Sequence, residues 1–186
     1  MLQWEEQLPA ALARAETERR VVLADFVKDD CAGCHALSTI TLADPAVQQL
    51  IATHFVPLRL NLSRRSDRLY FRRYQIIWTP TIAMLDRRGT LQYQAPGFHP
   101  VELFIPLLRI GLARTQIAWA RYREAAEQLT MAADPAGPLA AEALYWLGMT
   151  YYLAGEHQET LDATWRRLRT EHPSSLWAAR IPPSDL

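Results

Sequence analysis

Two cysteines separated by two residues are the clearest candidates for chemistry in this sequence. Cys31 and Cys34 are the only cysteines of the 186-residue chain, and His35 follows them directly. This spacing suits three kinds of site: a redox dithiol, half of a zinc site or, because a histidine comes next, an attachment point for a c-type haem. The residues around the pair have to decide among these interpretations.

The remaining histidines give little support to a metal site. Zinc would need two further ligands with the paired spacing that zinc motifs use. The complete Cys-Ala-Gly-Cys-His string agrees with the haem alternative. However, c-type haem is attached outside the cytoplasm, and we expect this protein to be cytoplasmic. We therefore favour the redox dithiol and expect no metal and no cofactor. The histidines that lack the paired spacing are His54, His99, His157 and His172.

The elements on either side of the cysteines place them where a dithiol would work. Residues 20–27 are apolar and rich in β-branched side chains, which predicts a buried strand. Helical spacing follows over residues 36–54. The cysteines thus lie where a strand gives way to a helix, and free backbone N–H groups at such a junction stabilise a thiolate. Cys31 is the expected nucleophile, and Cys34, one turn further on, is expected to attack the mixed disulfide.

Helix and strand patterns alternate over the rest of residues 1–114. Their order predicts an α/β domain with a mixed sheet and helices on both of its faces. Within residues 36–54, Asp44 and Pro45 mark a break at which a new helix is capped. The other predicted elements are a helix over 4–18, a strand over 55–62, a helix over 64–74, a hairpin of 81–86 and 90–95, and a helix over 100–114.

Three separated motifs in this region resemble the thioredoxin superfamily, in particular its thioredoxin-like members that begin with a Trp-containing helix. Gly97 also falls where the family has a glycine near its site. Any one of the motifs arises often by chance, but here all three occur in the family's order. They are Cys31-Ala-Gly-Cys34, Asp25 on the incoming strand, and Trp78-Thr79-Pro80-Thr81.

The resemblance implies a thioredoxin-like fold and a thiol-disulfide oxidoreductase that acts on protein disulfides. Asp25 would be a buried acid with a raised pKa that takes a proton from Cys34. Pro80 would follow a cis peptide bond, which leaves the backbone of Thr79 open to an extended substrate. Trp78 would be either a lip of the substrate groove or a core residue. The catalytic candidates are thus Cys31, Cys34 and Asp25, and the substrate-binding candidates are Trp78, Thr79 and Pro80.

Two features depart from the family pattern. Asp30 stands before the first cysteine, where thioredoxins usually have Trp, and its negative charge opposes a thiolate on Cys31. The segment 63–73 contains five arginines, which would suit an acidic partner, although a solvated helix face is the commoner reason for such a run.

The remaining residues, 115–186, show no strand pattern and form a second, all-α module. Residues 141–173 resemble one degenerate tetratricopeptide repeat. In this interpretation Gly148 permits close approach of a neighbouring helix, Gly155 lies in the turn and Pro173 ends the second helix. One repeat and a half cannot bury a core alone. We therefore expect the module to pack on the first domain or on another subunit, and to help select protein partners.

Composition limits the function further. Lys plus Arg and Asp plus Glu number 20 each, so no overall charge favours nucleic acid or an anionic membrane. The first twenty residues lack the apolar core of a secretory signal, so we expect a cytoplasmic protein. The alternative to an oxidoreductase is an interaction protein in which the helices bind partners and the dithiol is weakly active.

Overall fold

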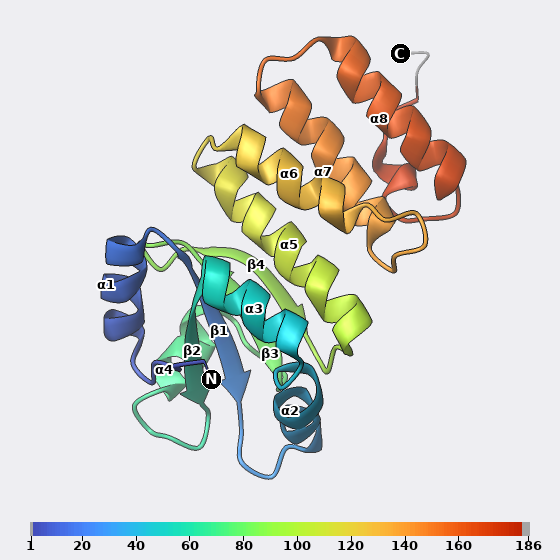
Figure 1. Cartoon of the computed structure of the whole chain (residues 1–186). Helices are drawn as coiled ribbons and strands as arrows, with labels where there is room; N and C mark the ends of the chain where they lie inside the picture. Colours follow the sequence, from blue (N-terminus) through green and yellow to red (C-terminus); the bar gives the residue numbers. More distant parts are fainter. Residues whose placement is uncertain (1, 184–186) are drawn as a thin grey trace. The chain divides into compact units, whose positions relative to one another are not determined.

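The chain divides after Phe104 into two compact units in a computed structural model that describes residues 2–183 (Figure 1). The first unit contains a sheet and its helices, and the second is helical. Each unit is described by itself.

Four strands make up the sheet of the first unit. The strand order is β2-β1-β3-β4, with β1 parallel to β2, and with β3 antiparallel to both β1 and β4. The predicted mixed sheet and its hairpin are thereby confirmed. The strands are β1 (Val21–Val27), β2 (Phe55–Asn61), β3 (Thr81–Leu85) and β4 (Leu91–Pro96).

Helices flank this sheet, as predicted. In Figure 1 α3 crosses in front of the strands, whereas α4 lies behind them. Alternate residues of β1 share a hydrophobic core with α1 and α4, and this core includes Val22, Ala24 and Phe26. Because strand side chains alternate between faces, Asp25 belongs to the opposite face. The helices are α1 (Leu8–Glu18), α2 (Ala32–Ala36), α3 (Pro45–His54) and α4 (Arg68–Arg73), with a π-helical turn over Leu37–Thr41.

The first helix begins later than the sequence predicted. A helix was expected from Trp4, but α1 begins at Leu8. The preceding segment instead pairs with the edge of β2, because the Glu5 N–H donates to the Pro57 carbonyl at 2.8 Å and the Arg59 N–H donates to the Glu5 carbonyl at 2.8 Å. The helix prediction was therefore wrong for residues 4–7, whose backbone bonds go to the sheet.

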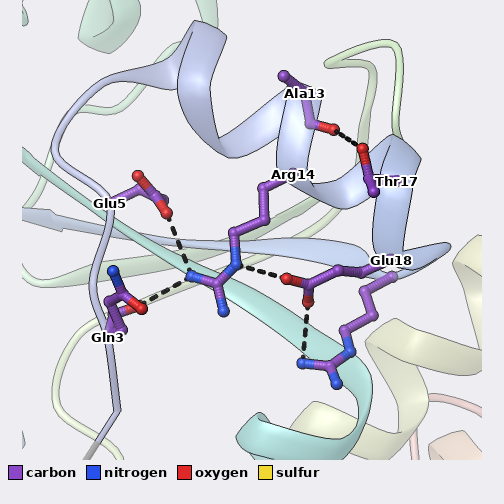
Figure 2. Close-up of polar contacts among 7 residues, drawn as sticks. Gln3, Glu5, Ala13, Arg14, Thr17 and Glu18 are labelled. Atoms are coloured by element: carbon purple, nitrogen blue, oxygen red, sulfur yellow. Dashed lines mark hydrogen bonds and ion pairs between the residues drawn. The ribbon is translucent and has the colours of Figure 1, made fainter.

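Arg14 ties this segment to α1 (Figure 2). Its guanidinium donates to Glu18 at 2.7 Å, to Glu5 at 3.1 Å and to the Gln3 carbonyl at 3.3 Å. All three partners are at the surface or partly buried, so each ion pair contributes at most about 1 kcal/mol to the free energy of unfolding. The contacts fix the direction of the segment more than they stabilise the fold.

The helical pattern over residues 36–54 is interrupted. The break predicted at Asp44 and Pro45 is confirmed, since the Asp44 carboxylate accepts the N–H groups of Ala46 and Val47 at 2.8 and 3.1 Å. The helix predicted over residues 64–74 is shorter, because α4 begins only at Arg68.

The second unit consists of helices. Several helices follow the sheet, as the sequence predicted, and α5 begins in the first unit and continues into the second. The predicted helix over 100–114 is extended to Ala118. The helices are α5 (Val101–Ala118), α6 (Tyr122–Ala132), α7 (Ala140–Leu153) and α8 (Gln158–Glu171), followed by a 3-10 turn at Ala178–Arg180.

Gly148 permits α7 and α8 to approach closely, as predicted. A Cβ atom added at Gly148 would lie 2.8 Å from the Trp165 ring. That ring is held in place because it stacks on Tyr145 with centroids 5.5 Å apart, and its Nε1–H donates to the Tyr145 carbonyl at 3.2 Å. Gly155, with φ +83°, lies in the connection between the two helices. The tetratricopeptide-like character of this pair stays a prediction.

Candidate active site

The two cysteines lie at the start of α2, directly after the turn that follows β1. Their sulfurs are bonded to each other at 2.11 Å. Cys31 is the N-cap residue, and its Sγ accepts the Cys34 N–H at 3.1 Å. Both residues are only partly buried, so a partner has access to the pair. A hydrogen bond to sulfur stabilises the ionised form more than the neutral thiol, which favours Cys31 as the sulfur that leaves or attacks.

The loop before β3 lies against the dithiol. The Thr79 hydroxyl donates to Cys31 Sγ at 3.6 Å, and the peptide bond between Thr79 and Pro80 is cis. A Cβ atom added at Gly33 would lie 3.0 Å from Pro80 Cδ, so the absence of a side chain at Gly33 lets the proline pack on the active-site turn. Residues far apart in the sequence are thus brought together here.

The backbone of this loop leaves hydrogen-bonding groups open. The Gly97 N–H donates to the Pro80 carbonyl at 2.7 Å, and the Thr81 hydroxyl donates to the Trp78 carbonyl at 2.8 Å. Within residues 2–183, the backbone N–H and carbonyl of Thr79 have no such partner. An extended peptide placed beside Cys31 would find both groups available.

Trp78 belongs to the surface, so it is not the core residue that was one of the two roles considered for it. Its side chain is 66% exposed and that of Ile77 is 94% exposed. Both border a hollow of about 520 Å³ that opens beside Cys31. The other residues around this hollow are Lys28, Asp30, Ala32, Gly33, Leu62, Phe71, Ile76 and Thr79.

Asp25 is buried behind the site, with 1% of its surface exposed. Burial raises its pKa to about 6, while the charge of Arg59 and a hydrogen bond from it act in the opposite direction. One carboxylate oxygen, Oδ2, accepts from Arg59 Nη2 at 3.0 Å and from Nε at 3.1 Å. The other, Oδ1, is buried and has no hydrogen-bond partner among the described residues. Arg59 and Cys34 border the same hollow on the second side of the dithiol.

Sequence reasoning missed Arg59. This residue is the register partner of Asp25 in the parallel pair β1–β2, and its guanidinium lies 4.5 Å from the centroid of the Trp4 ring. Its position as a charged residue within the predicted apolar strand 55–62 was a usable signal. The pairing itself was not predictable, because it depends on the register between two strands.

Negative charge lies on one side of the cysteines. The Asp29 carboxylate accepts from the Asn61 side-chain amide at 2.8 Å, and this bond is the main reason why the pKa of Asp29 is lowered. Asp30 adjoins Cys31 with a left-handed backbone, φ +57°. Lys28 is the basic residue of this turn, and Arg59 borders the same hollow.

Among residues 2–183, no three His, Cys, Asp or Glu side chains gather as ligands for an ion. No helix in the same range combines the length and the apolar character needed to cross a bilayer.

Comparison with known proteins agrees with this geometry. The sequence model of the family described as thioredoxin-like domain matches residues 8–111. A thioredoxin from Thermus thermophilus is 29% identical, with a TM-score of 0.53 over 58% of this chain and 85% of that one. A Bacteroides thetaiotaomicron protein, assigned only provisionally as a disulphide-isomerase, is 22% identical, with a TM-score of 0.52 over 62% and 93% of the two chains. Among curated proteins, no sequence matches this chain.

Proposed function

Because the chain belongs to the thioredoxin-like domain family, we propose that it is a thiol-disulfide oxidoreductase that reduces or exchanges disulfides in proteins. The observation that carries the proposal is the position of Cys31, whose sulfur accepts hydrogen bonds from Cys34 and from Thr79 and borders an open hollow. A nucleophilic sulfur needs this combination of thiolate stabilisation and access.

The reaction begins with the reduced protein. The Cys31 thiolate attacks one sulfur of the substrate disulfide, which forms a mixed disulfide and releases the second substrate sulfur as a thiolate that takes up a proton from water. Cys34 then loses its proton and attacks Cys31 Sγ, which releases the first substrate sulfur. The substrate gains two electrons, and the protein is left with the Cys31–Cys34 bond that the structure contains. A dithiol reductant returns it to the starting state.

Asp25 is the proposed acceptor of the Cys34 proton. Its unpaired Oδ1 and its pKa of about 6 suit a group that holds a proton only briefly near neutral pH. Arg59, which holds the other oxygen of Asp25, borders the same hollow as Cys34, and the proposed route of the proton passes through water that enters this hollow. Trp78, Thr79 and Pro80 are the proposed contacts for the substrate chain, with the open backbone of Thr79 pairing with it.

Trapping of substrates tests this proposal. We expect the Cys34→Ser variant to accumulate mixed disulfides with cellular proteins through Cys31, and a dithiol to release them. The Cys31→Ser variant is the matched control, because it keeps one cysteine but removes the proposed nucleophile. It should trap nothing and should reduce insulin disulfides at the uncatalysed rate. If Cys34→Ser forms no adducts and the unmodified protein does not accelerate insulin reduction, the proposal is wrong.

The helical unit is proposed to select partners and the cytoplasm is the proposed location, where a reducing environment favours reduction. Exposed apolar side chains on this unit support a binding role, among them Tyr152 and Leu176, which are 52% and 80% exposed. Replacing both by Ser in the Cys34→Ser chain should change the set of trapped proteins and leave the rate on a small disulfide unchanged. An unchanged set would contradict the selecting role.

A further inference from the structure

Two hollows on the surface of the first unit have lining residues in common, and we treat them as one groove. The first opens beside Cys31 and Trp78, and the second lies along α4. We call the combined feature the arginine groove, because three arginines border the end far from the cysteines. They are Arg65, Arg68 and Arg72, and the residues that line both hollows are Leu62, Phe71, Ile76 and Ile77.

The five arginines of residues 63–73 differ in the groups that contact their guanidiniums. Arg64 pairs with Glu6 at 3.0 Å, and the guanidinium of Arg73 lies 5.3 Å from the centroid of the Tyr74 ring; neither borders the groove. Of those that do, Arg68 donates only to the Leu62 carbonyl, at 3.3 Å. Within the described residues, Arg65 and Arg72 form no ion pair, and no acidic residue borders the second hollow. The positive charge at the arginine end of the groove is therefore uncompensated, whereas nearer the cysteines Lys28 and Asp30 both border the first hollow.

Apolar surface joins this charge to the reactive sulfur. Ile76, Ile77 and Trp78 follow one another along the edge of the groove, and the last two are mostly exposed. The strip belongs to the loop that follows α4, and neighbouring exposed apolar side chains of this kind are typical of binding surfaces. The hollow on the second side of the dithiol has no such excess of positive charge, because Asp29 and Asp30 border it together with Lys28 and Arg59.

We propose that the arginine groove binds an extended, acidic segment of the disulfide-bearing partner, on one side of the cysteine that Cys31 attacks. Arg65, Arg68 and Arg72 contact its carboxylates, and the apolar residues that line both hollows take an apolar residue between them and the cysteine. This specificity rests on the proposed oxidoreductase function and names the class of substrate that it favours.

Synthetic peptides test the proposal directly. Each contains one cysteine, linked through a disulfide to 2-mercaptoethanol, with an Ile and three Glu residues on one side. The matched peptide has Gln in place of Glu. Each peptide is made in two versions, with the Ile and the Glu or Gln residues either before or after the cysteine. We expect the reduced protein to react with the Glu peptide of the preferred order about tenfold faster than with its Gln counterpart at low salt, because complementary charge accelerates association. High salt should remove the difference.

Paired variants locate the effect. The groove variant carries Arg65→Gln, Arg68→Gln and Arg72→Gln. The control variant carries Arg64→Gln, Arg73→Gln and Arg88→Gln, so both lose three positive charges, and no control position borders either hollow. The preference for Glu should vanish in the groove variant and persist in the control. Reduction of bis(2-hydroxyethyl) disulfide, which is uncharged, should be equal in both. Arg72→Gln and Arg73→Gln as single changes repeat the comparison with less disturbance of the surface.

Binding separates a failure of this inference from a failure of the proposed function. Fluorescence anisotropy with Ser in place of the peptide cysteine measures affinity for the oxidised protein without any reaction. A protein that reduces no disulfide but binds the Glu peptide through the three arginines would support the groove and overturn the oxidoreductase. Equal binding and equal rates for the Glu and Gln peptides, or a preference that survives in the groove variant, would overturn the groove.

Discussion

Each of the two units buries a carboxyl group whose pKa is raised by that burial, and the two groups differ in what surrounds them. Asp25 in the first unit is 1% exposed and Glu142 in the second is 8% exposed. In both cases the charge of one or more arginines acts against the effect of burial. A raised pKa is thus common to both units and does not by itself identify a catalytic acid.

The surroundings make the distinction. Asp25 lies on the strand that leads to the cysteines, and its partner Arg59 borders a hollow with Cys34. Glu142 lies in the first turn of α7. The arginines that act on its pKa, Arg114 and Arg180, have guanidiniums 4.7 and 4.3 Å from the centroids of tryptophan rings. The first acid is therefore proposed to serve chemistry, and the second to belong to the packing of the helices.

The largest effect is expected for Asp25→Asn, measured as the pH dependence of unfolding in the oxidised protein. The pKa of Asp25 is about 6 in the folded protein and 3.8 as its ordinary value. Between these values the folded state binds the extra proton, so stability falls as pH rises from about 4 to 6 and stays lower above this range. Asn carries no charge, so the variant should be more stable than the unmodified protein at pH 8 by up to about 3 kcal/mol, relative to their difference at pH 4.

The same variant has a kinetic consequence. Without a proton acceptor, attack by Cys34 on the mixed disulfide should slow at least about tenfold at pH 7, and the rise of its rate with pH through about 6 should disappear. Denaturant unfolding at several pH values and rapid-quench kinetics provide the two measurements. A stability gain without any change in this step would leave Asp25 as a structural acid only.

Much of the first unit was predictable because its signals are local. The apolar run of β1, the turn of the β3–β4 hairpin and the Asp44 cap each specify their element through a few neighbouring residues. The start of α1 was not predictable in this way. Trp4 has helical spacing relative to Leu8, but the backbone of Glu5 bonds to the distant β2 edge, and no local pattern contains that competition.

The active site likewise has features that the sequence predicts and features that depend on the fold. The dithiol is visible in the sequence, whereas its nearness to Thr79 was implied only by the family resemblance, since the residues are 48 positions apart. The pair of Asp25 and Arg59 depends on strand register, which the sequence leaves open. The groove arginines could not be separated from Arg64 and Arg73 until the ion pair with Glu6 and the contact with Tyr74 were known.

An intermediate effect, on the pH dependence of the resolving step, is expected for Arg59→Gln. Arg59 lowers the pKa of Asp25 through its charge and its hydrogen bond, so its loss should raise that pKa above about 6, by roughly one unit. The pH at which the resolving step accelerates should move up by the same amount, which stopped-flow kinetics can follow. Arg64→Gln is the matched control, because Arg64 pairs with Glu6 at the surface. A midpoint that moves equally in both variants would indicate a general charge effect instead of a specific pair.

The smallest effect on the pH dependence of stability is expected for Glu142→Gln. This variant tests whether a buried carboxyl group outside the first unit also affects the dithiol. Burial raises the pKa of Glu142, and the charges of Arg114 and Arg180 act against this rise, so the folded state binds an extra proton at pH values above the ordinary pKa of Glu, which is 4.5. At pH 8 the variant should be more stable than the unmodified protein, relative to their difference at pH 4, by less than Asp25→Asn is, because two arginines offset the cost of burial. The resolving step and its pH profile should be unchanged, since nothing about Glu142 connects it to the dithiol. If Glu142→Gln altered that profile as Asp25→Asn does, burial of any carboxyl group would suffice to produce the effect, and the assignment of proton transfer to Asp25 would fail.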